Sequence, residues 1–299
     1  MAMTTSVSIT PGQEKQLKRF VADAAERAVD SALKQAVVDP EGMQRIFARG
    51  DDLQAAVEPV VLAKLKELSV TNKYANEEVP SKYVYPPTYR RRSITEQTNR
   101  LRELIPGAGY ADEKLAELPL LPGAEWHFAI LRWQSVAPTY GEACEKLLAI
   151  AKTLYKGKFK NWLEGQLGPG YLRQGQRSAA KYRELGEQQK GYDILVVQGQ
   201  LGLRHAGCSP RRADERFLGN EFGLGLFGNL CIILTHPERL STGEELWMDC
   251  TGDERSPGAD GQFESVPYLN FNDGGFQLGN NWFDDAIDDY GSSSGFLPQ

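Results

Sequence analysis

Cysteine and histidine are the residues of this chain best suited to bind a metal or to act as nucleophile and base. His205 precedes Cys208 by three residues, and Cys231 precedes His236 by five, with Cys250 nearby. Neither spacing matches the short paired turns that hold zinc, and the acidic residues after Cys250 raise a thiol pKa. We therefore assign no metal site, no cofactor and no catalytic residue, and the roles of these five residues stay open.

Acidic and aromatic residues are concentrated near the C-terminus. Residues 249–299 contain ten Asp or Glu, one Arg, no Lys, eight Gly and eight aromatic residues. This composition is too aromatic for a disordered acidic tail and indicates loops on a β surface. Aromatic rings supply contact area, and amides and carboxylates supply hydrogen bonds. We predict a non-enzymatic binding protein that presents these side chains to a protein or another macromolecule: Asn280, Asn281, Trp282, Phe283, Asp284, Asp285, Asp288, Asp289 and Tyr290. The alternative is that the aromatic members belong to the core.

An enzymatic alternative uses the same acidic loops. A divalent metal held by carboxylates, with His205 or His236 as general base, would make a hydrolase. Calcium is another candidate for these loops, although none of them has the EF-hand register. Both alternatives require carboxylates from several loops to converge on one site.

A nucleic-acid alternative rests on basic residues between positions 90 and 160. Lysine and arginine with interleaved aromatic rings suit phosphate contact and base stacking. The residues concerned are Arg90, Arg91, Arg92, Lys156, Lys158 and Lys160, with Tyr155 and Trp162 as the stacking rings. The net charge of −6 for the whole chain argues against this function.

Charge is distributed unevenly along the chain. Residues 191–299 contain 17 acidic residues and six Arg, which gives −11, so the preceding residues carry about +5. The four cysteines are too few and too scattered for a disulfide framework. No secretory signal and no run of membrane-spanning length is visible. We expect a cytoplasmic, globular protein whose oligomeric state is unknown.

The elements that position these residues divide into two groups. Helical periodicity predicts three N-terminal helices, over 10–36, 40–50 and 51–68, the last bent at Pro59. These form a helical module over residues 1–70, whose helices are able to pair between chains. The period is lost between Thr71 and Arg92, which predicts a linker. Residues 93–299 then form a mixed domain with a small antiparallel sheet, so the fold class is α+β.

Within the mixed domain, local signals predict most elements. Capping boxes at Ser93 and Thr139 start two helices, and a third helix is expected over 176–189. Strands are expected over 126–133, 192–198 and 222–234, followed by a hairpin around Asn272 to Gly275. No helix is expected after the glycines Gly223, Gly225 and Gly228, so we interpret them as packing glycines and predict no nucleotide site.

The order of these elements over residues 120–299 resembles that of a C-type-lectin-like domain. The resemblance implies two helices beside a small antiparallel sheet, a long loop that carries the ligand surface, and an insertion over 199–262. The paired cysteines and the Glu-Pro-Asn type calcium residues of that family are missing here. Segments 234–240, 249–254 and 291–299 are also similar to segments of a bacterial protein family of unknown activity.

Overall fold

The structure is a computed structural model that describes residues 11–35, 40–68 and 72–298. The chain divides into two compact units, Met1–Leu68 and Ser69–Gln299. Residues 10 and 36, the ends of the first expected helix, lie outside the described residues. In the described part of the chain, no helix combines the length and the hydropathy that crossing a membrane requires.

The first unit contains three helices. They are α1 (Pro11–Gln35), α2 (Pro40–Phe47) and α3 (Gly50–Leu68), as the periodicity predicted. Helix α3 continues through Pro59. Large apolar side chains on all three helices are exposed, among them Phe20, Phe47 and Val60. Packing within the described part of this unit therefore leaves much apolar surface in contact with water.

The second unit has an α+β fold built around two sheets. The first sheet has the order β1-β4-β11-β5, and all its strand pairs are antiparallel. The second has the path β10-β6-β8-β7-β3, and β9 joins β8 to β2. Its β10–β6 and β2–β9 pairs are parallel, so this sheet is mixed. The strands of the first sheet are β1 (Trp126–Leu131), β4 (Ile194–Gln200), β5 (Glu221–Gly223) and β11 (Ser294–Phe296).

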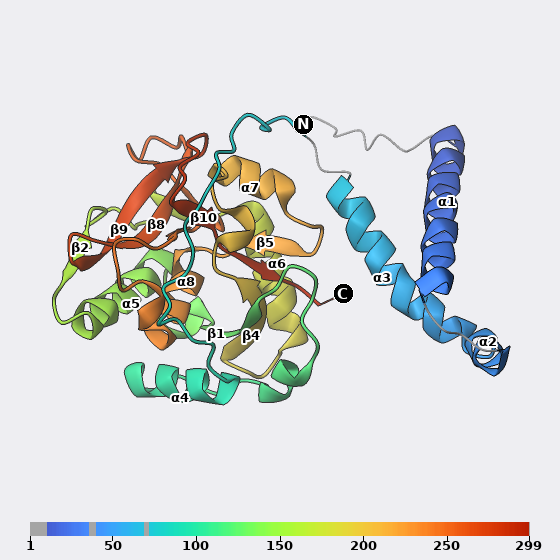
Figure 1. Cartoon of the computed structure of the whole chain (residues 1–299). Coiled ribbons are helices and arrows are strands. Elements are labelled where there is room, and N and C mark those ends of the chain that lie inside the picture. The colour runs from blue at the N-terminus through green and yellow to red at the C-terminus, as the bar shows by residue number, and fades with distance from the viewer. Residues whose placement is uncertain (1–10, 36–39, 69–71, 299) are drawn as a thin grey trace. The chain divides into compact units, whose positions relative to one another are not determined.

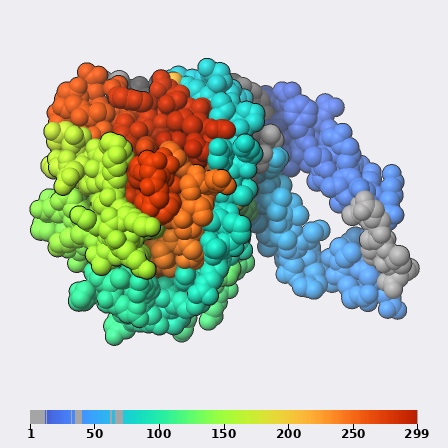
Figure 2. Space-filling model, turned by 60° about the vertical axis from the view of Figure 1, so that its left-hand side comes forward, coloured from blue at the N-terminus to red at the C-terminus, as the bar shows by residue number. Residues whose placement is uncertain are grey.

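The second sheet contains the hairpin that the sequence predicted. Strands β8 (Ser265–Asn272) and β9 (Gly275–Trp282) are joined through Asp273 and Gly274, both of which have positive φ. Figure 2 shows the orange-red hairpin beside the yellow-green residues around β2 (Phe159–Asn161), in agreement with the β2–β9 pairing. The remaining strands of this sheet are β3 (Leu172–Gln174), β6 (Trp247–Asp249), β7 (Asp253–Arg255) and β10 (Tyr290–Ser292).

Five α-helices accompany the sheets in the described part of this unit. They are α4 (Ile94–Leu104), α5 (Tyr140–Leu154), α6 (Gln176–Gln188), α7 (Pro210–Arg216) and α8 (Leu226–Thr235). Short 3₁₀ helices lie between the other elements; they are η1 (Glu113–Glu117), η2 (Trp133–Ser135), η3 (Leu203–His205) and η4 (Pro237–Arg239). Both predicted capping boxes are present, at Ser93 before α4 and at Thr139 before α5.

Helix α8 corrects one sequence-based expectation. Residues 222–234 were expected to form a strand because three glycines interrupt an apolar run. Only β5 is extended, and all ten residues of α8 form a buried helix that packs against α5, β1 and α4. Figure 1 shows α8 at the centre of the unit. A helix that is apolar on every side is stable only where neighbours cover it on every side.

Residues 72–92 run along the surface of the second unit, where Figure 1 and Figure 2 show them in cyan. Tyr85 donates a hydrogen bond to Glu125 at 2.9 Å, and Arg92 pairs with Glu238. Glu77 accepts three hydrogen bonds from Arg211 and one from Ser209. The segment expected as a linker thus contributes side-chain contacts to this unit.

Candidate functional site

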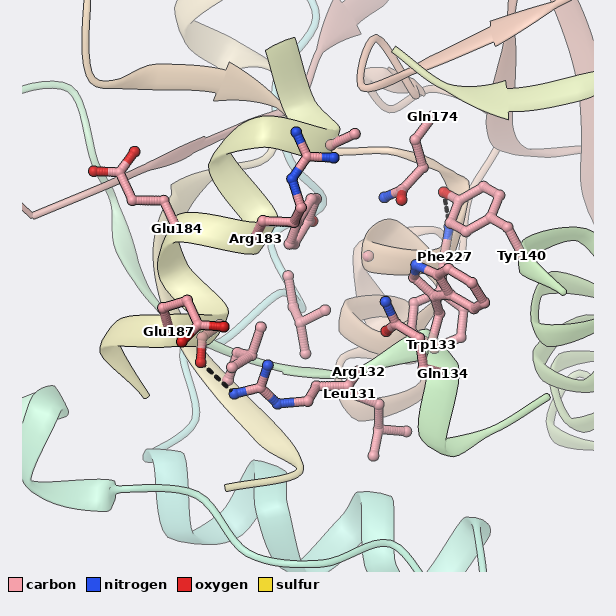
Figure 3. A pocket seen from close by; sticks show the side chains of 16 residues that line it. Leu131, Arg132, Trp133, Gln134, Tyr140, Gln174, Arg183, Glu184, Glu187 and Phe227 are labelled. Atoms are coloured by element: carbon pink, nitrogen blue, oxygen red, sulfur yellow. Dashed lines mark hydrogen bonds between the residues drawn. The ribbon is translucent and has the colours of Figure 1, made fainter. Parts of the chain in front are cut away.

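A pocket of the second unit lies between the end of β1 and one face of α6. It has a volume of about 420 Å³. Its walls come from β1, η2, the start of α5, β3, α6 and the first turn of α8. Figure 3 shows Gln174, Arg183 and Trp133 on three sides of it. Concave sites of this size, lined by apolar groups with a few polar ones, are typical of small-molecule binding.

Three aromatic rings form one wall of this pocket. Trp133 and Tyr140 pack edge to face with ring centroids 5.9 Å apart, and Phe227 lies 6.3 Å from Tyr140. The apolar side chains of Ile130 and Leu195 also line the pocket. Aromatic walls of this kind accommodate a planar or apolar ligand body.

Four polar side chains line the pocket and have no hydrogen-bond or ion-pair partner in the described part of the chain: the exposed Gln134, Arg183 and Glu187 and the partly exposed Gln174. The Tyr182 hydroxyl also lacks a hydrogen bond, although its oxygen is buried. Arg183 and Glu187 lie one turn apart on α6, a spacing at which side chains of opposite charge can pair. No ion pair between them is present, so both remain available to a ligand.

Arg132 has a structural role at the edge of the pocket. Its guanidinium donates to the carbonyl oxygens of Gly186, Gln189 and Tyr192, at 2.7, 2.8 and 2.7 Å. Two of these carbonyls belong to the C-terminal end of α6, where a cation is favoured. Arg132 thus holds α6 against β1, and with it the positions of Arg183 and Glu187.

Behind the aromatic wall, Asp253 occupies the N-terminus of α8. Its carboxylate accepts hydrogen bonds from the Leu226 backbone N–H at 2.7 Å and from the Tyr140 hydroxyl at 2.8 Å. Burial raises the pKa of Asp253 to about 7, although these hydrogen bonds oppose the shift. The carboxylate thus satisfies one N–H group of the first helical turn, and the Tyr140 hydroxyl accepts from the next, that of Phe227.

The glycines before α8 make room for this carboxylate. Gly223 ends β5, Gly225 is the N-cap of α8 and Gly228 lies in the first turn of this helix. Glycines also follow a strand and open a helix in nucleotide-binding loops, whereas no helix was expected here. A Cβ atom at Gly225 would lie 2.3 Å from Asp253 Oδ1, and one at Gly223 would lie 2.5 Å from the Gly252 nitrogen. Since Asp253 already fills the position of a phosphate, the glycines serve close packing.

A second pocket, of about 330 Å³, lies at the start of α6 and is lined by Ser178, Arg211, Asp214 and Phe283 among others. The Asp214 side chain is 56% exposed and lies 3.6 Å from the Arg177 guanidinium. Arg211 is engaged with Glu77, and Ser178 donates to the Gly223 carbonyl. Several polar groups of this pocket thus have partners within the unit.

The nine residues predicted to bind a ligand fall into an inner and an outer group. Asn281 is buried and donates to Asp249, Asn280 accepts from Arg255, and Tyr290 is buried against Trp247 and Tyr268. On the outside, Trp282 is 45% exposed. The other outer members are the exposed Asp284, Asp285 and Asp288 and the partly exposed Phe283 and Asp289. Strand alternation along β9 places Asn281 inward and Trp282 outward.

Both histidines proposed as general base are buried. His205 Nε2 forms a hydrogen bond with Glu221 Oε1 at 2.8 Å, and burial lowers the pKa of the His205 imidazole. Burial also lowers the pKa of His236 to about 4. Neither residue lines the two pockets described above. Among the described residues, no three His, Cys, Asp or Glu side chains gather in a way that would hold a metal ion.

The cysteines are buried in the fold, and Tyr155, one of the two aromatic rings of the basic cluster, packs against the core. All four cysteines are buried and unpaired, and burial raises the pKa of Cys208, Cys231 and Cys250. The Tyr155 ring stacks on Phe276 inside the unit, and its hydroxyl donates to backbone carbonyls. It is therefore not available to stack on a base. Trp162 is 55% exposed, with Lys160 over its ring.

Sequence reasoning missed the residues of the first pocket. They come from four segments that are far apart in the chain: 130–140, 174–187, 195 and 227–228. Each segment taken alone is typical of a helix surface or of the end of a strand. One local signal was present: Trp133 and Gln134 lie two and three residues after the end of the apolar strand β1. Residues at strand ends commonly carry function.

Comparison of the chain with models of protein families, with curated proteins and with solved structures found no significant match.

Proposed function

We propose that the second unit is a binding protein whose principal site is the pocket between β1 and α6. The observation that carries this proposal is the set of unpartnered polar side chains around an aromatic wall. Gln134 and Gln174 offer amide donors and acceptors, and Arg183 and Glu187 offer opposite charges. The ligand that suits this lining is a small molecule with a ring and charged groups of both signs.

The pocket favours a ring for physical reasons. Trp133, Tyr140 and Phe227 present faces and edges with which another ring packs favourably, at about 0.5–1.5 kcal/mol beyond the burial of area. A carboxylate on the ligand would make a charge-assisted, bidentate contact with Arg183. An ammonium group would pair with Glu187. Arg132 keeps α6 in place, so the site needs little rearrangement on binding.

Binding is expected for ring compounds that carry both charges. Calorimetry on the full chain with tryptophan and phenylalanine as probes, alongside tryptophan amide and N-acetyltryptophan, separates the charge requirements. We expect Arg183→Gln to weaken the amino acids by about tenfold and to leave tryptophan amide nearly unaffected, because the amide lacks the carboxylate. Glu187→Gln should likewise weaken the amino acids and leave N-acetyltryptophan nearly unaffected, because that compound lacks the ammonium group.

Glu164→Gln provides a matched control, because Glu164 is exposed and lies outside the pocket. Trp133→Leu removes a ring while keeping an apolar side chain, and should weaken every ring compound. If none of the probes binds, or if Trp133→Leu and Arg183→Gln both bind them as tightly as the parent protein does, this site is not the ligand site.

A second candidate function is recognition of a macromolecule by the outer residues of segment 282–289. It is favoured by the exposure of Trp282 beside the exposed Asp284, Asp285 and Asp288. Arg211 approaches Asp284 only to 3.8 Å and bonds mainly to Glu77. The surface therefore keeps a negative charge next to an exposed ring, which suits a basic segment of a partner protein.

A synthetic peptide rich in arginine and lysine tests this surface. We expect peptide binding to be weakened by about tenfold or more in the triple variant Asp284→Asn, Asp285→Asn and Asp288→Asn. Added salt should also weaken peptide binding by the parent protein, because it screens exposed charges. The control neutralises three exposed acids elsewhere, by Glu117→Gln, Glu145→Gln and Glu164→Gln. Equal binding by the two triple variants would show that only net charge matters, and would reject a specific surface.

A further inference from the structure

A third, smaller pocket lies on the first sheet, on the face opposite to the pocket between β1 and α6. It has a volume of about 130 Å³, and its walls come from η1, β1, β4, the C-terminal end of α6 and Pro298. His127 and Gln198, which are paired across β1 and β4, both line it. Strand alternation turns these two side chains away from the face of Ile130 and Leu195, which line the larger pocket. All lining residues of the small pocket belong to the second unit.

His127 is the buried polar side chain of this pocket that has no partner. It is only 5% exposed, and its Nε2 forms no hydrogen bond with the described residues. The two buried amides of the lining are already engaged, since Gln189 bonds to the backbone of Val196 and Gln198 bonds to the backbone of residues 119–121. Buried polar groups in folded proteins nearly always have a partner. The imidazole therefore indicates that a ligand supplies one.

The surroundings of His127 favour a ligand group without charge. Burial alone lowers the pKa of the His127 imidazole, so the ring is neutral at pH 7. The same loss of hydration disfavours a charged ligand group at this position. Asp112, a partly exposed carboxyl of the lining, also repels a ligand carboxylate. A hydroxyl group is neutral and both donates and accepts, so it matches either nitrogen of a neutral imidazole.

Apolar side chains make up much of the remaining lining, which suits a compact apolar ligand body. They are Leu115, Leu118, Val196 and Pro298. Leu118 is 45% exposed, so a ligand in the pocket would remove part of its apolar surface from water. Cavities of about 150 Å³ with apolar walls hold benzene. A pocket of about 130 Å³ thus has room for a body of about one ring.

We propose that this pocket binds a small neutral molecule with a hydroxyl group on a compact apolar body, and that the hydroxyl bonds to His127. The site shares no lining residue with the pocket between β1 and α6. The two sites therefore stand or fall separately.

Nuclear magnetic resonance of the full chain with phenol and toluene as probes tests the role of the imidazole. The chain has three histidines, so the ring signal of His127 is identified by its loss in His127→Phe. We expect phenol to shift this signal in the parent protein. His127→Phe should bind phenol about tenfold more weakly and toluene no more weakly than the parent, because only phenol loses a hydrogen-bond partner. If phenol does not bind, or if the ratio of the two affinities is unchanged in His127→Phe, the proposal is wrong.

A pair of rim variants tests the apolar wall without changing a buried residue. Leu118→Gln should weaken both probes about threefold, because their apolar body loses a contact. Leu120→Gln is the matched control, since Leu120 is 38% exposed and does not line the pocket. Trp133→Leu, in the larger pocket, should leave the phenol-induced shift of His127 unchanged. Equal effects of the two leucine variants, or loss of the His127 shift in Trp133→Leu, would overturn the assignment of phenol to this pocket.

Discussion

Asp249→Asn is expected to flatten the pH dependence of stability between about pH 4 and pH 8. Asp249 ends β6, is fully buried, and accepts hydrogen bonds from Asn281 at 3.2 and 3.3 Å. Burial raises the pKa of its carboxyl to about 8, the Asn281 hydrogen bond opposes this, and Asp289 and Asp285 raise it further. Asparagine keeps the shape of the side chain and does not titrate.

The direction follows from proton linkage. The pKa of this carboxyl is 3.8 in the absence of the fold, so between about pH 4 and pH 8 the folded state binds more protons than the unfolded state. The stability is fully present below about pH 4 and is lost as the pH rises toward 8. One unit of pKa corresponds to about 1.4 kcal/mol, so the loss reaches the order of several kcal/mol.

Urea denaturation at a series of pH values measures this effect. The parent should lose free energy of unfolding across the window, and Asp249→Asn should lose less of it. Some slope will remain, because burial also raises the pKa of Asp253 and Glu245 to about 7. Asp273→Asn, in the exposed hairpin turn, serves as control and should follow the parent. Parallel profiles for the parent and Asp249→Asn would show that Asp249 is not protonated in the fold.

Arg239→Met is expected to lower the free energy of unfolding by about 3–5 kcal/mol, as removal of one partner from a buried charged network does. The Arg239 guanidinium is fully buried and donates to the carbonyls of Leu246 and Leu201 at 2.7 and 2.8 Å. It also lies 4.2 Å from the centre of the Tyr85 ring. Methionine fills similar volume but leaves both carbonyls without their donor and removes a positive charge that lowers the pKa of the nearby Glu125 carboxyl.

Chemical denaturation measures this loss, and two further variants make it interpretable. Arg239→Lys keeps the charge but cannot bridge two carbonyls with a planar fork, so its loss should be intermediate. Arg173→Met breaks a half-exposed ion pair with Glu254 and should cost about 1 kcal/mol or less. A loss in Arg239→Met no greater than that in Arg173→Met would contradict a central role for this arginine.

Local sequence signals determined most of the elements around the site. The capping boxes at Ser93 and Thr139 and the Asp273-Gly274 turn act through neighbouring residues. A side chain three positions away, or a turn that needs positive φ, is a short-range constraint that the sequence alone expresses. The division into a helical unit and an α+β unit followed from periodicity for the same reason.

The acidic C-terminal segment was only partly predictable. Its composition indicated an exposed surface, and Trp282, Asp284, Asp285 and Asp288 are exposed. Asn281, however, is buried against Asp249, which lies 32 residues earlier in the chain. Composition describes a segment as a whole, whereas the register of β9 decides which side chains face inward.

Tertiary structure alone decided α8 and the pocket. The apolar run that reads as a strand is helical because α5, β1 and α4 cover it and Asp253, 27 residues away, occupies its N-terminus. The pocket likewise needs Arg132 to hold α6 near β1 before Trp133 and Arg183 face the same space. These contacts join residues that are distant in the chain, so no local sequence pattern indicates them. The sequence by itself determined which segments are helix, turn and acidic surface, and only packing decided which side chains meet.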